Sequence, residues 1–254
     1  MRYDLKLPDK SGQLIQVLQE LPDKGDKFPT VLLVSGFGMD LHEYGYLDDV
    51  SRVLNQNGIQ TFRFSYIGTG KSQGKFSETT LDKHVEQLKI VFNYIKADRF
   101  TNLTKIGIFA QSFGTAVVVA AWPLPRVKTL IFTSAPPDPY KSLSTYFRRQ
   151  RGFNPEGISE AERADGHKTR VGPQFWSSLE RINFFRKISE INRPILFIHG
   201  GNDRLVRAAE TFKYYEQVQT RKKFLVIERA NHGFSGQFRP KVVELISDWF
   251  SETL

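Results

Sequence analysis

Residues 105–121 read KIGIFAQSFGTAVVVAA, two apolar runs that meet at a turn containing Ala110, Ser112 and Gly114. The first run predicts a buried β-strand, and the second, rich in alanine and valine, predicts a helix. Small residues two positions before and after Ser112 are typical of a sharp turn, where larger side chains would collide with the strand or helix. The pattern therefore predicts a turn that raises the Ser112 hydroxyl above the sheet, beside the first N–H groups of the helix.

Two further polar residues follow strand-like runs later in the chain. The run PILFIHGGND ends at Asp203, and the run KFLVIERANH ends at His232. Taken alone, Ser112 is interpreted as a helix cap, Asp203 as a turn residue and His232 as a surface residue. In the chain order serine, aspartate, histidine they instead predict a nucleophile, an acid and a base that act together.

Strand-like runs alternate with amphipathic stretches along most of the chain. We expect strands within 12–21, 30–38, 59–66, 105–114, 129–137, 194–203 and 223–232. We expect helices over roughly 45–57, 79–97, 113–121, 207–219 and 239–252. The first strand alternates as an antiparallel strand does, and most of the others are nearly continuous in apolar residues, as strands buried on both faces are. This predicts an α/β fold whose mostly parallel central sheet is flanked by helices.

The alternation breaks over residues 136–190, which show no strand signal. The segment is polar, is punctuated by Gly and Pro, and carries several aromatic residues. We expect an inserted helical cap (lid) between the two parts of a core formed by 1–135 and 191–254. A disordered linker is the weaker interpretation, because the aromatic side chains would have nothing to pack against. Phe175 and Trp176 of the insert are predicted to line the substrate pocket.

Residues 65–72, SYIGTGKS, end like a phosphate-binding loop. That loop requires glycine at the first position, where this chain has Ser65, so the pattern is incomplete. Outside Asp203, no predicted strand ends in an aspartate that could bind the Mg²⁺ of a nucleotide. A nucleotide site is therefore not expected.

Together these motifs resemble the α/β-hydrolase fold over essentially the whole chain. Within it, residues 35–81, SGFGMDLHEYGYLDDVSRVLNQNGIQTFRFSYIGTGKSQGKFSETTL, are similar to the serine-aminopeptidase-like and cinnamoyl (feruloyl) esterase branch. That branch carries a His-Gly-Phe oxyanion loop and an Arg-Phe-Asp-x-x-Gly-x-Gly-x-Ser segment. This chain departs from it with Ser35 for the histidine and Ser65 for the aspartate. The resemblance implies an oxyanion hole made by the backbone N–H groups of Phe37 and Phe113.

The resemblance and the three polar residues imply a serine carboxylesterase that acts through an acyl-enzyme and needs no cofactor. The substrate is expected to be a small acyl ester, either an aryl or hydroxycinnamoyl ester or a short-chain one. Thioesterase, acyltransferase and small peptidase activities stay open, because pocket shape and water access separate them. A non-catalytic hydrolase-like binding protein is the remaining alternative, and a broken triad would be its sign.

The chain carries 36 Lys and Arg against 27 Asp and Glu, a formal charge of +9. The basic residues are scattered, with short clusters at FRRQR and TRKK that lack the aromatic spacing of a nucleic-acid platform. We therefore expect a solvated basic surface and no nucleic-acid partner, with a basic entrance for anionic substrates as the alternative. The cap holds more basic than acidic residues, which weakly favours anionic or phenolic acids.

Several classes of site and location are disfavoured by composition. There are no cysteines, which excludes disulfides and thiolate ligands, and no His, Asp or Glu spacing resembles a metal site. No apolar stretch is long enough to span a membrane, and the N-terminus does not resemble a signal peptide. We expect a cytoplasmic protein and leave open whether it forms a homodimer.

Four other histidines are present. His42 falls in the oxyanion-loop region and His167 in the cap. His84 is expected to be exposed on its helix. His199 is expected near the core, where it would shape the turn that holds Asp203.

Overall fold

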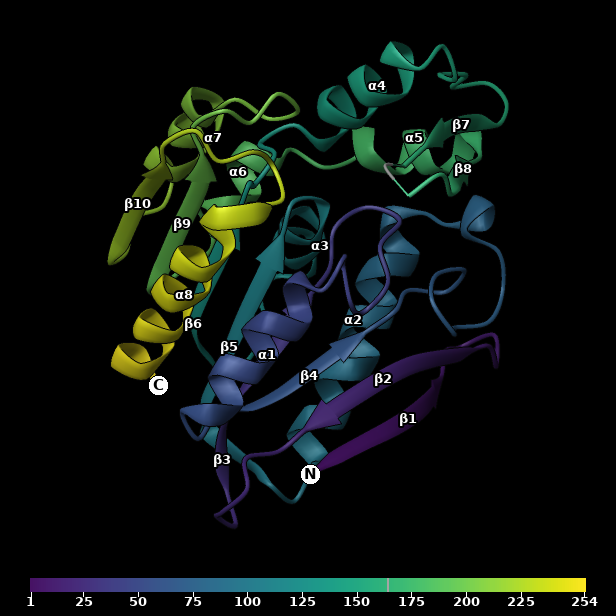
Figure 1. The fold of residues 1–254 in the computed structure, drawn as a ribbon. Helices are drawn as coiled ribbons and strands as arrows, with labels where there is room; N and C mark the ends of the chain where they lie inside the picture. Colours follow the sequence, from purple (N-terminus) through teal and green to yellow (C-terminus); the bar gives the residue numbers. More distant parts are fainter. Residues whose placement is uncertain (164) are drawn as a thin grey trace.

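An eight-stranded sheet forms the centre of the computed structural model, which describes residues 1–163 and 165–254 (Figure 1). All neighbouring pairs from β4 to β10 are parallel, and β2 runs antiparallel to both of its neighbours. Across the sheet the strands are β1 (Arg2–Pro8), β2 (Leu14–Glu20), β4 (Gln60–Phe64), β3 (Phe28–Val34), β5 (Thr101–Gln111), β6 (Val127–Thr133), β9 (Ile195–Gly200) and β10 (Lys222–Ile227). The predicted mostly parallel sheet is confirmed.

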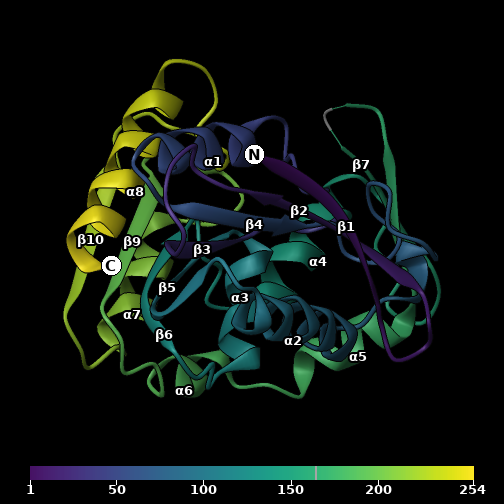
Figure 2. The same cartoon turned by 90° about the horizontal axis from the view of Figure 1, so that it is seen from below.

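Helices cover both faces of this sheet (Figure 2). One face packs against α1 (Tyr46–Gln56) and α8 (Arg239–Thr253). The other packs against α2 (Leu81–Ala97), α3 (Phe113–Ala121) and α7 (Ala208–Glu216). Because both faces are covered, adjacent residues of one strand enter different cores: Val31 and Leu33 of β3 face α1 and α8, and Leu32 faces the other layer. The five helices expected from the sequence are all present.

The segment between β6 and β9 contains the remaining elements, and α4, β7, β8 and α5 lie beyond the carboxyl ends of the strands (Figure 1). These elements are α4 (Pro139–Arg149), β7 (Ser159–Glu162), β8 (Lys168–Val171), α5 (Pro173–Glu180) and α6 (Phe184–Ile188). Two 3₁₀ turns, η1 (Phe76–Glu78) and η2 (Gly236–Phe238), lie outside this segment. The division into a core and a cap agrees with this arrangement and stays a prediction. None of the helices in the two described ranges is long and apolar enough to cross a bilayer.

The antiparallel hairpin of β7 and β8 corrects the expectation of an insert without strands. Each of its strands has only four residues, so too few positions are present for an apolar alternation to be recognised. Charged side chains also meet across the hairpin. Glu160 of β7 forms ion pairs of 2.9 Å with Lys168 and 2.6 Å with Arg170 of β8.

Candidate active site

Ser112 lies in the turn between β5 and α3 with φ +51° and ψ −123°. A non-glycine residue in such a conformation stores roughly 1–3 kcal/mol of strain, which the surroundings must enforce. The Ser112 N–H donates to the carbonyl of Thr133 at 2.8 Å, and its carbonyl accepts from the N–H of Thr115 at 3.0 Å. At Gly114 a Cβ atom would lie 2.5 Å from the carbonyl oxygen of Ser35. The glycine of the A-x-S-x-G pattern, Gly114, is therefore required because the end of β3 approaches it closely.

The structure brings the three polar residues of the sequence pattern together. His232 Nε2 lies 2.7 Å from Ser112 Oγ, and His232 Nδ1 lies 2.7 Å from Asp203 Oδ2. The three side chains come from the carboxyl ends of β5, β9 and β10, which are far apart in the sequence and share one edge of the sheet. The resulting chain of hydrogen bonds can move a proton from the serine to the imidazole.

Asp203 is held as a carboxylate by its surroundings. Burial would raise the pKa of its carboxyl, but hydrogen bonds from His199 and His232 outweigh burial and hold the pKa well below its usual range. Its Oδ1 also accepts from the N–H groups of Leu205 and Val206, at 2.8 and 2.9 Å. The fully buried His199 lies with Nε2 3.3 Å from Asp203 Oδ2 and 2.9 Å from the Val206 carbonyl. His199 thus lies in the core beside the Asp203 turn, as expected, and its role in shaping that turn stays a prediction.

The oxyanion loop, residues 35–39, passes directly beside the serine. A Cβ atom at Gly36 would lie 3.5 Å from Ser112 Cβ, so glycine allows the loop to approach the nucleophile turn. The rings of Phe37 and Phe113 stand edge to face with centroids 5.7 Å apart. The two residues whose N–H groups are predicted to form the oxyanion hole are thus neighbours close to Ser112, at this edge of the sheet.

Other side chains support the loop where Ser35 replaces the histidine of the resembled branch. Glu43 Oε2 accepts from the Gly36 N–H at 3.0 Å. Ser65 Oγ accepts from the Leu41 N–H at 3.1 Å. Glu43 could not be identified from the sequence, because nothing in the local pattern indicates that this acidic residue turns inward.

The N–H groups of the SYIGTGKS loop form hydrogen bonds within the protein. The N–H of Lys71 donates to Gln16 Oε1 at 2.9 Å, and the N–H of Ile67 donates to Gln87 Oε1 at 2.9 Å. The N–H groups of Gly68, Thr69 and Ser72 donate to carbonyl groups of the same loop. A phosphate cradle needs such groups free and converging, so the geometry agrees with the expectation that no nucleotide binds.

Phe175 and Trp176 of α5 are 0% and 1% exposed, so they do not form an open wall. The Phe175 ring packs 5.3 Å from Phe37 and 5.7 Å from Phe113, measured between centroids. The Trp176 ring packs 5.4 Å from Phe175. These two residues therefore back the oxyanion loop from the side of the insert, and any effect on substrate would pass through Phe37 or Phe113.

The expectation that His84 is exposed was wrong. Its side chain is 1% exposed and stands edge to face with Tyr66, Phe76 and Phe113. Its Nδ1 lies 2.8 Å from the carbonyl of Thr80, and burial lowers the pKa of the imidazole to about 4. His84 is therefore a neutral packing residue at neutral pH, on the side of the α2 helix that meets the aromatic cluster.

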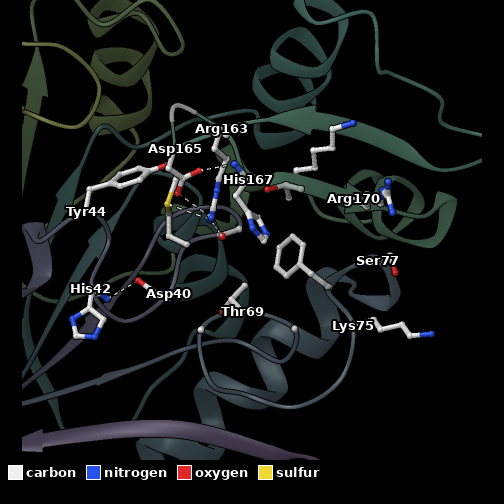
Figure 3. A pocket seen from close by; sticks show the side chains of 18 residues that line it. Asp40, His42, Tyr44, Thr69, Lys75, Ser77, Arg163, Asp165, His167 and Arg170 are labelled. Carbon is white, nitrogen blue, oxygen red and sulfur yellow. Dashed lines mark hydrogen bonds and ion pairs between the residues drawn. The ribbon is translucent and has the colours of Figure 1, made fainter.

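A cavity of about 890 Å³ lies beside the oxyanion loop, between the 68–77 loop and the β7–β8 hairpin (Figure 3). Its charged lining residues are Asp40, Lys75, Arg163, Asp165, Lys168 and Arg170. Arg163 reaches back to donate to the Gly38 carbonyl and pairs with Asp165 at 3.2 Å. His42 and His167 also face the cavity, and His42 Nδ1 lies 2.9 Å from Asp48. In the described residues, no group of three His, Cys, Asp or Glu side chains is arranged to hold a metal ion.

Comparisons with known proteins agree with this architecture. Residues 25–145 match the family described as serine aminopeptidase, S33. Est1E from Butyrivibrio proteoclasticus, solved with ferulic acid bound, is 23% identical, with 98% of each chain covered and a TM-score of 0.81. The esterase domain of a Rhodothermus marinus protein is 21% identical, with 100% of this chain and 99% of that one covered and a TM-score of 0.77. The α/β hydrolase GrgF from Penicillium sp. sh18 is 16% identical, with 100% of this chain and 99% of that one covered and a TM-score of 0.81.

The search of curated protein sequences found no match. The family match and the shared fold confirm the predicted α/β-hydrolase architecture and the predicted resemblance to serine hydrolases.

Proposed function

We propose that this chain, an α/β hydrolase with an esterase-like fold, cleaves carboxylic esters through an acyl-enzyme on Ser112. The observation that carries the proposal is the pair of 2.7 Å contacts that His232 makes, one with Ser112 Oγ and one with Asp203 Oδ2. The serine stands at a strained turn followed by a helix, where a nucleophile is accessible from the substrate side.

The chemistry follows from these contacts. The Ser112 oxygen attacks the acyl carbon while His232 takes the hydroxyl proton, and His232 then returns that proton to the leaving alcohol. Asp203 holds the imidazole in the tautomer whose Nε2 accepts, and it stabilises the imidazolium that forms. The N–H groups of Phe37 and Phe113 would hold the tetrahedral oxygen, where loss of one donor costs roughly 10²–10³-fold in rate. Water, activated by His232, completes the cycle.

One observation favours esters over the other acyl compounds, and a second bears on the charge of the substrate. Two of the similar structures belong to esterases, one of them solved with a phenolic acid bound. The cavity next to the oxyanion loop carries four basic side chains, Lys75, Arg163, Lys168 and Arg170, against two acidic ones, Asp40 and Asp165. This balance suits a substrate with an anionic or phenolic end, although ion pairs with Glu160 and Asp165 weaken it.

A panel of acyl compounds tests the proposed function. We expect the wild-type protein to hydrolyse p-nitrophenyl acetate and butyrate, and methyl ferulate, and to show lower kcat/KM for acyl thioesters and aminoacyl anilides. Each rate is measured against the same amount of the Ser112→Ala variant as a blank. Turnover of the anilides with none of the esters would replace the esterase by a peptidase, and no turnover of any member would favour a binding protein.

We also propose that residues 136–190 act as a cap that sets substrate preference and takes no part in the chemistry. Phe175→Ala would open space behind Phe37, so esters of different bulk should be affected unequally. The ranking among them should change by roughly 1–3 kcal/mol in kcat/KM, the scale of apolar pocket discrimination. Trp176→Ala should do the same more weakly, because it reaches Phe37 through Phe175.

The matched control is Phe185→Ala, which removes an aromatic ring of the same segment that is 39% exposed and packs on Tyr214. This variant should keep the wild-type ranking. Equal losses for every ester in a folded Phe175→Ala protein would instead assign part of the catalytic machinery to the cap.

A further inference from the structure

Glu43 is an acidic residue whose backbone turns its side chain toward the interior. It lies in the loop between β3 and α1, and it has φ +45°, followed by Tyr44 at +54° and Gly45 at +78°. Three successive left-handed residues are unusual outside glycine, and a structural demand must hold them. The Glu43 N–H donates to Asp40 Oδ1 at 3.1 Å, and Glu43 is 9% exposed. The strained backbone of residues 43–45 is therefore associated with a buried Glu43 carboxyl group.

The buried carboxyl lies directly against the oxyanion loop. Its Oε2 accepts from the Gly36 N–H at 3.0 Å. A Cβ atom at Gly36 would lie 3.0 Å from Glu43 Oε1 and 3.5 Å from Ser112 Cβ, so Gly36 stands between the carboxyl and the serine. Gly36 is joined by one peptide unit to Phe37, whose N–H is the proposed oxyanion donor. A group that fixes Gly36 therefore fixes the direction of that donor.

Four titratable or charged groups face Glu43 from the elements around it. They are Asp40 on the same loop, Tyr46 of α1, Tyr66 after β4 and Arg239 of α8. The hydroxyl groups of Tyr46 and Tyr66 are buried and have no hydrogen-bond partner within the described ranges. On the far side of Gly36, Ser112 leads to His232. No cation makes an ion pair with Glu43 among the described residues.

The protonation state of Glu43 follows from these surroundings. Burial raises the pKa of the carboxyl to about 8; the Gly36 N–H and Arg239 lower it, and Asp40 raises it. At pH 7 the group is therefore a neutral acid that still accepts the Gly36 hydrogen bond. Its ionisation at higher pH would place a negative charge next to the site where the tetrahedral oxygen becomes negative.

We propose that Glu43 is a positioning residue of the oxyanion loop, which as an uncharged acid holds the Ser35–Gly36 peptide, the unit before the Phe37 donor, and weakens oxyanion stabilisation when it ionises. The activity part of this inference rests on the proposed function, and the burial of a neutral acid does not. Glu43 thus acts beside the proposed triad and touches neither the substrate nor the reacting atoms. It also accounts for the support of a loop that has Ser35 in place of the histidine.

The Glu43→Gln variant separates the support of the loop from the effect of ionisation, because glutamine keeps an acceptor oxygen and cannot ionise. On p-nitrophenyl acetate, wild-type kcat should fall above pH 8, by up to about tenfold per pH unit if the ionised form is inactive. Glu43→Gln should match the wild type near pH 6.5 and lack this alkaline fall. Glu43→Leu, which removes the acceptor, should lower kcat by about 10- to 100-fold with a small change in KM, less than loss of an oxyanion donor itself.

Two further variants guard against unrelated explanations. Asp40→Asn keeps an acceptor oxygen for the loop and removes the charge that raises the Glu43 pKa, so it should move the alkaline fall to lower pH. Glu216→Gln changes an exposed glutamate at the end of α7 and should keep the wild-type profile. An alkaline fall that persists unchanged in Glu43→Gln would overturn the role in oxyanion stabilisation.

Thermal unfolding tests the neutral acid without any substrate. Glutamate in the unfolded chain has a pKa near 4.5, and the folded pKa is about 8, so the stability from protonated Glu43 is full below pH 4.5 and is lost as pH rises to 8. The Tm of Glu43→Gln relative to wild type should therefore rise between pH 5 and pH 8 and then level off. Parallel Tm curves would refute the buried neutral acid. If no ester is hydrolysed but the Tm difference appears, the proposed function fails and the burial of Glu43 stands.

Discussion

Replacing Ser112 by alanine is expected to lower kcat for every ester by about 10⁶-fold, the scale of removing a serine nucleophile that acts as a unit with its histidine. Without the hydroxyl no acyl-enzyme can form, and water would have to attack the ester directly. The remaining rate would come from substrate binding and from the Phe37 and Phe113 donors. Single-turnover and steady-state rates on p-nitrophenyl acetate measure the change.

The fold of the Ser112→Ala protein should be unchanged, because within the described residues the hydroxyl hydrogen-bonds to the imidazole alone, while the backbone bonds to Thr133 and Thr115 remain. Its Tm should match or exceed that of the wild type. Ser189→Ala, at an exposed serine of the insert, serves as the control and should be fully active. Ser112→Ala activity within 100-fold of wild type would show that another residue is the nucleophile.

Asp203→Asn is expected to lower kcat by about 10⁴-fold, the scale seen when the carboxylate of a Ser-His-Asp triad is lost. Asparagine can present its NH₂ group to His232 Nδ1, which would turn the acceptor to that side and leave Nε2 unable to take the serine proton. The backbone bonds of Leu205 and Val206 to Oδ1 can persist, so the turn should fold. The decrease should be similar for all esters, because each uses the same histidine.

Measuring kcat of Asp203→Asn for small and bulky esters distinguishes a misoriented histidine from a changed substrate pocket. The control Asp248→Asn, at an exposed position of α8, should leave every rate unchanged. A decrease that differs widely between esters would mean that Asp203 shapes the substrate site and does not orient the histidine.

The sheet and the helices were predictable because their signals are local. Runs such as TVLLV and KIGIF are apolar on both faces, as buried parallel strands require, and longer stretches with helical patterns lie between such runs. Strand β1 was missed because it is an edge strand in which only Leu5 and Leu7 are partly buried and the other side chains are exposed. The four-residue strands of the β7–β8 hairpin carry too little pattern to recognise.

The arrangement of Ser112, Asp203 and His232 could be anticipated from chain order and strand ends, because parallel strands place their carboxyl ends at one edge. Their catalytic roles stay predictions. The burial of His84 and Phe175 could not be read from the sequence, because each is covered by aromatic side chains from distant segments. The inward orientation of Glu43 accompanies three successive left-handed residues, 43–45. Two of them are not glycine, so the sequence does not predict this backbone conformation.

Covalent labelling tests the central claim, that Ser112 is the nucleophile, most directly. Wild-type protein treated with a fluorophosphonate probe is digested, and the modified peptide is identified by mass spectrometry. We expect one adduct per chain, on Ser112, formed more slowly in Asp203→Asn and absent in Ser112→Ala. An adduct on another residue, or no adduct on protein that hydrolyses esters, would contradict the account.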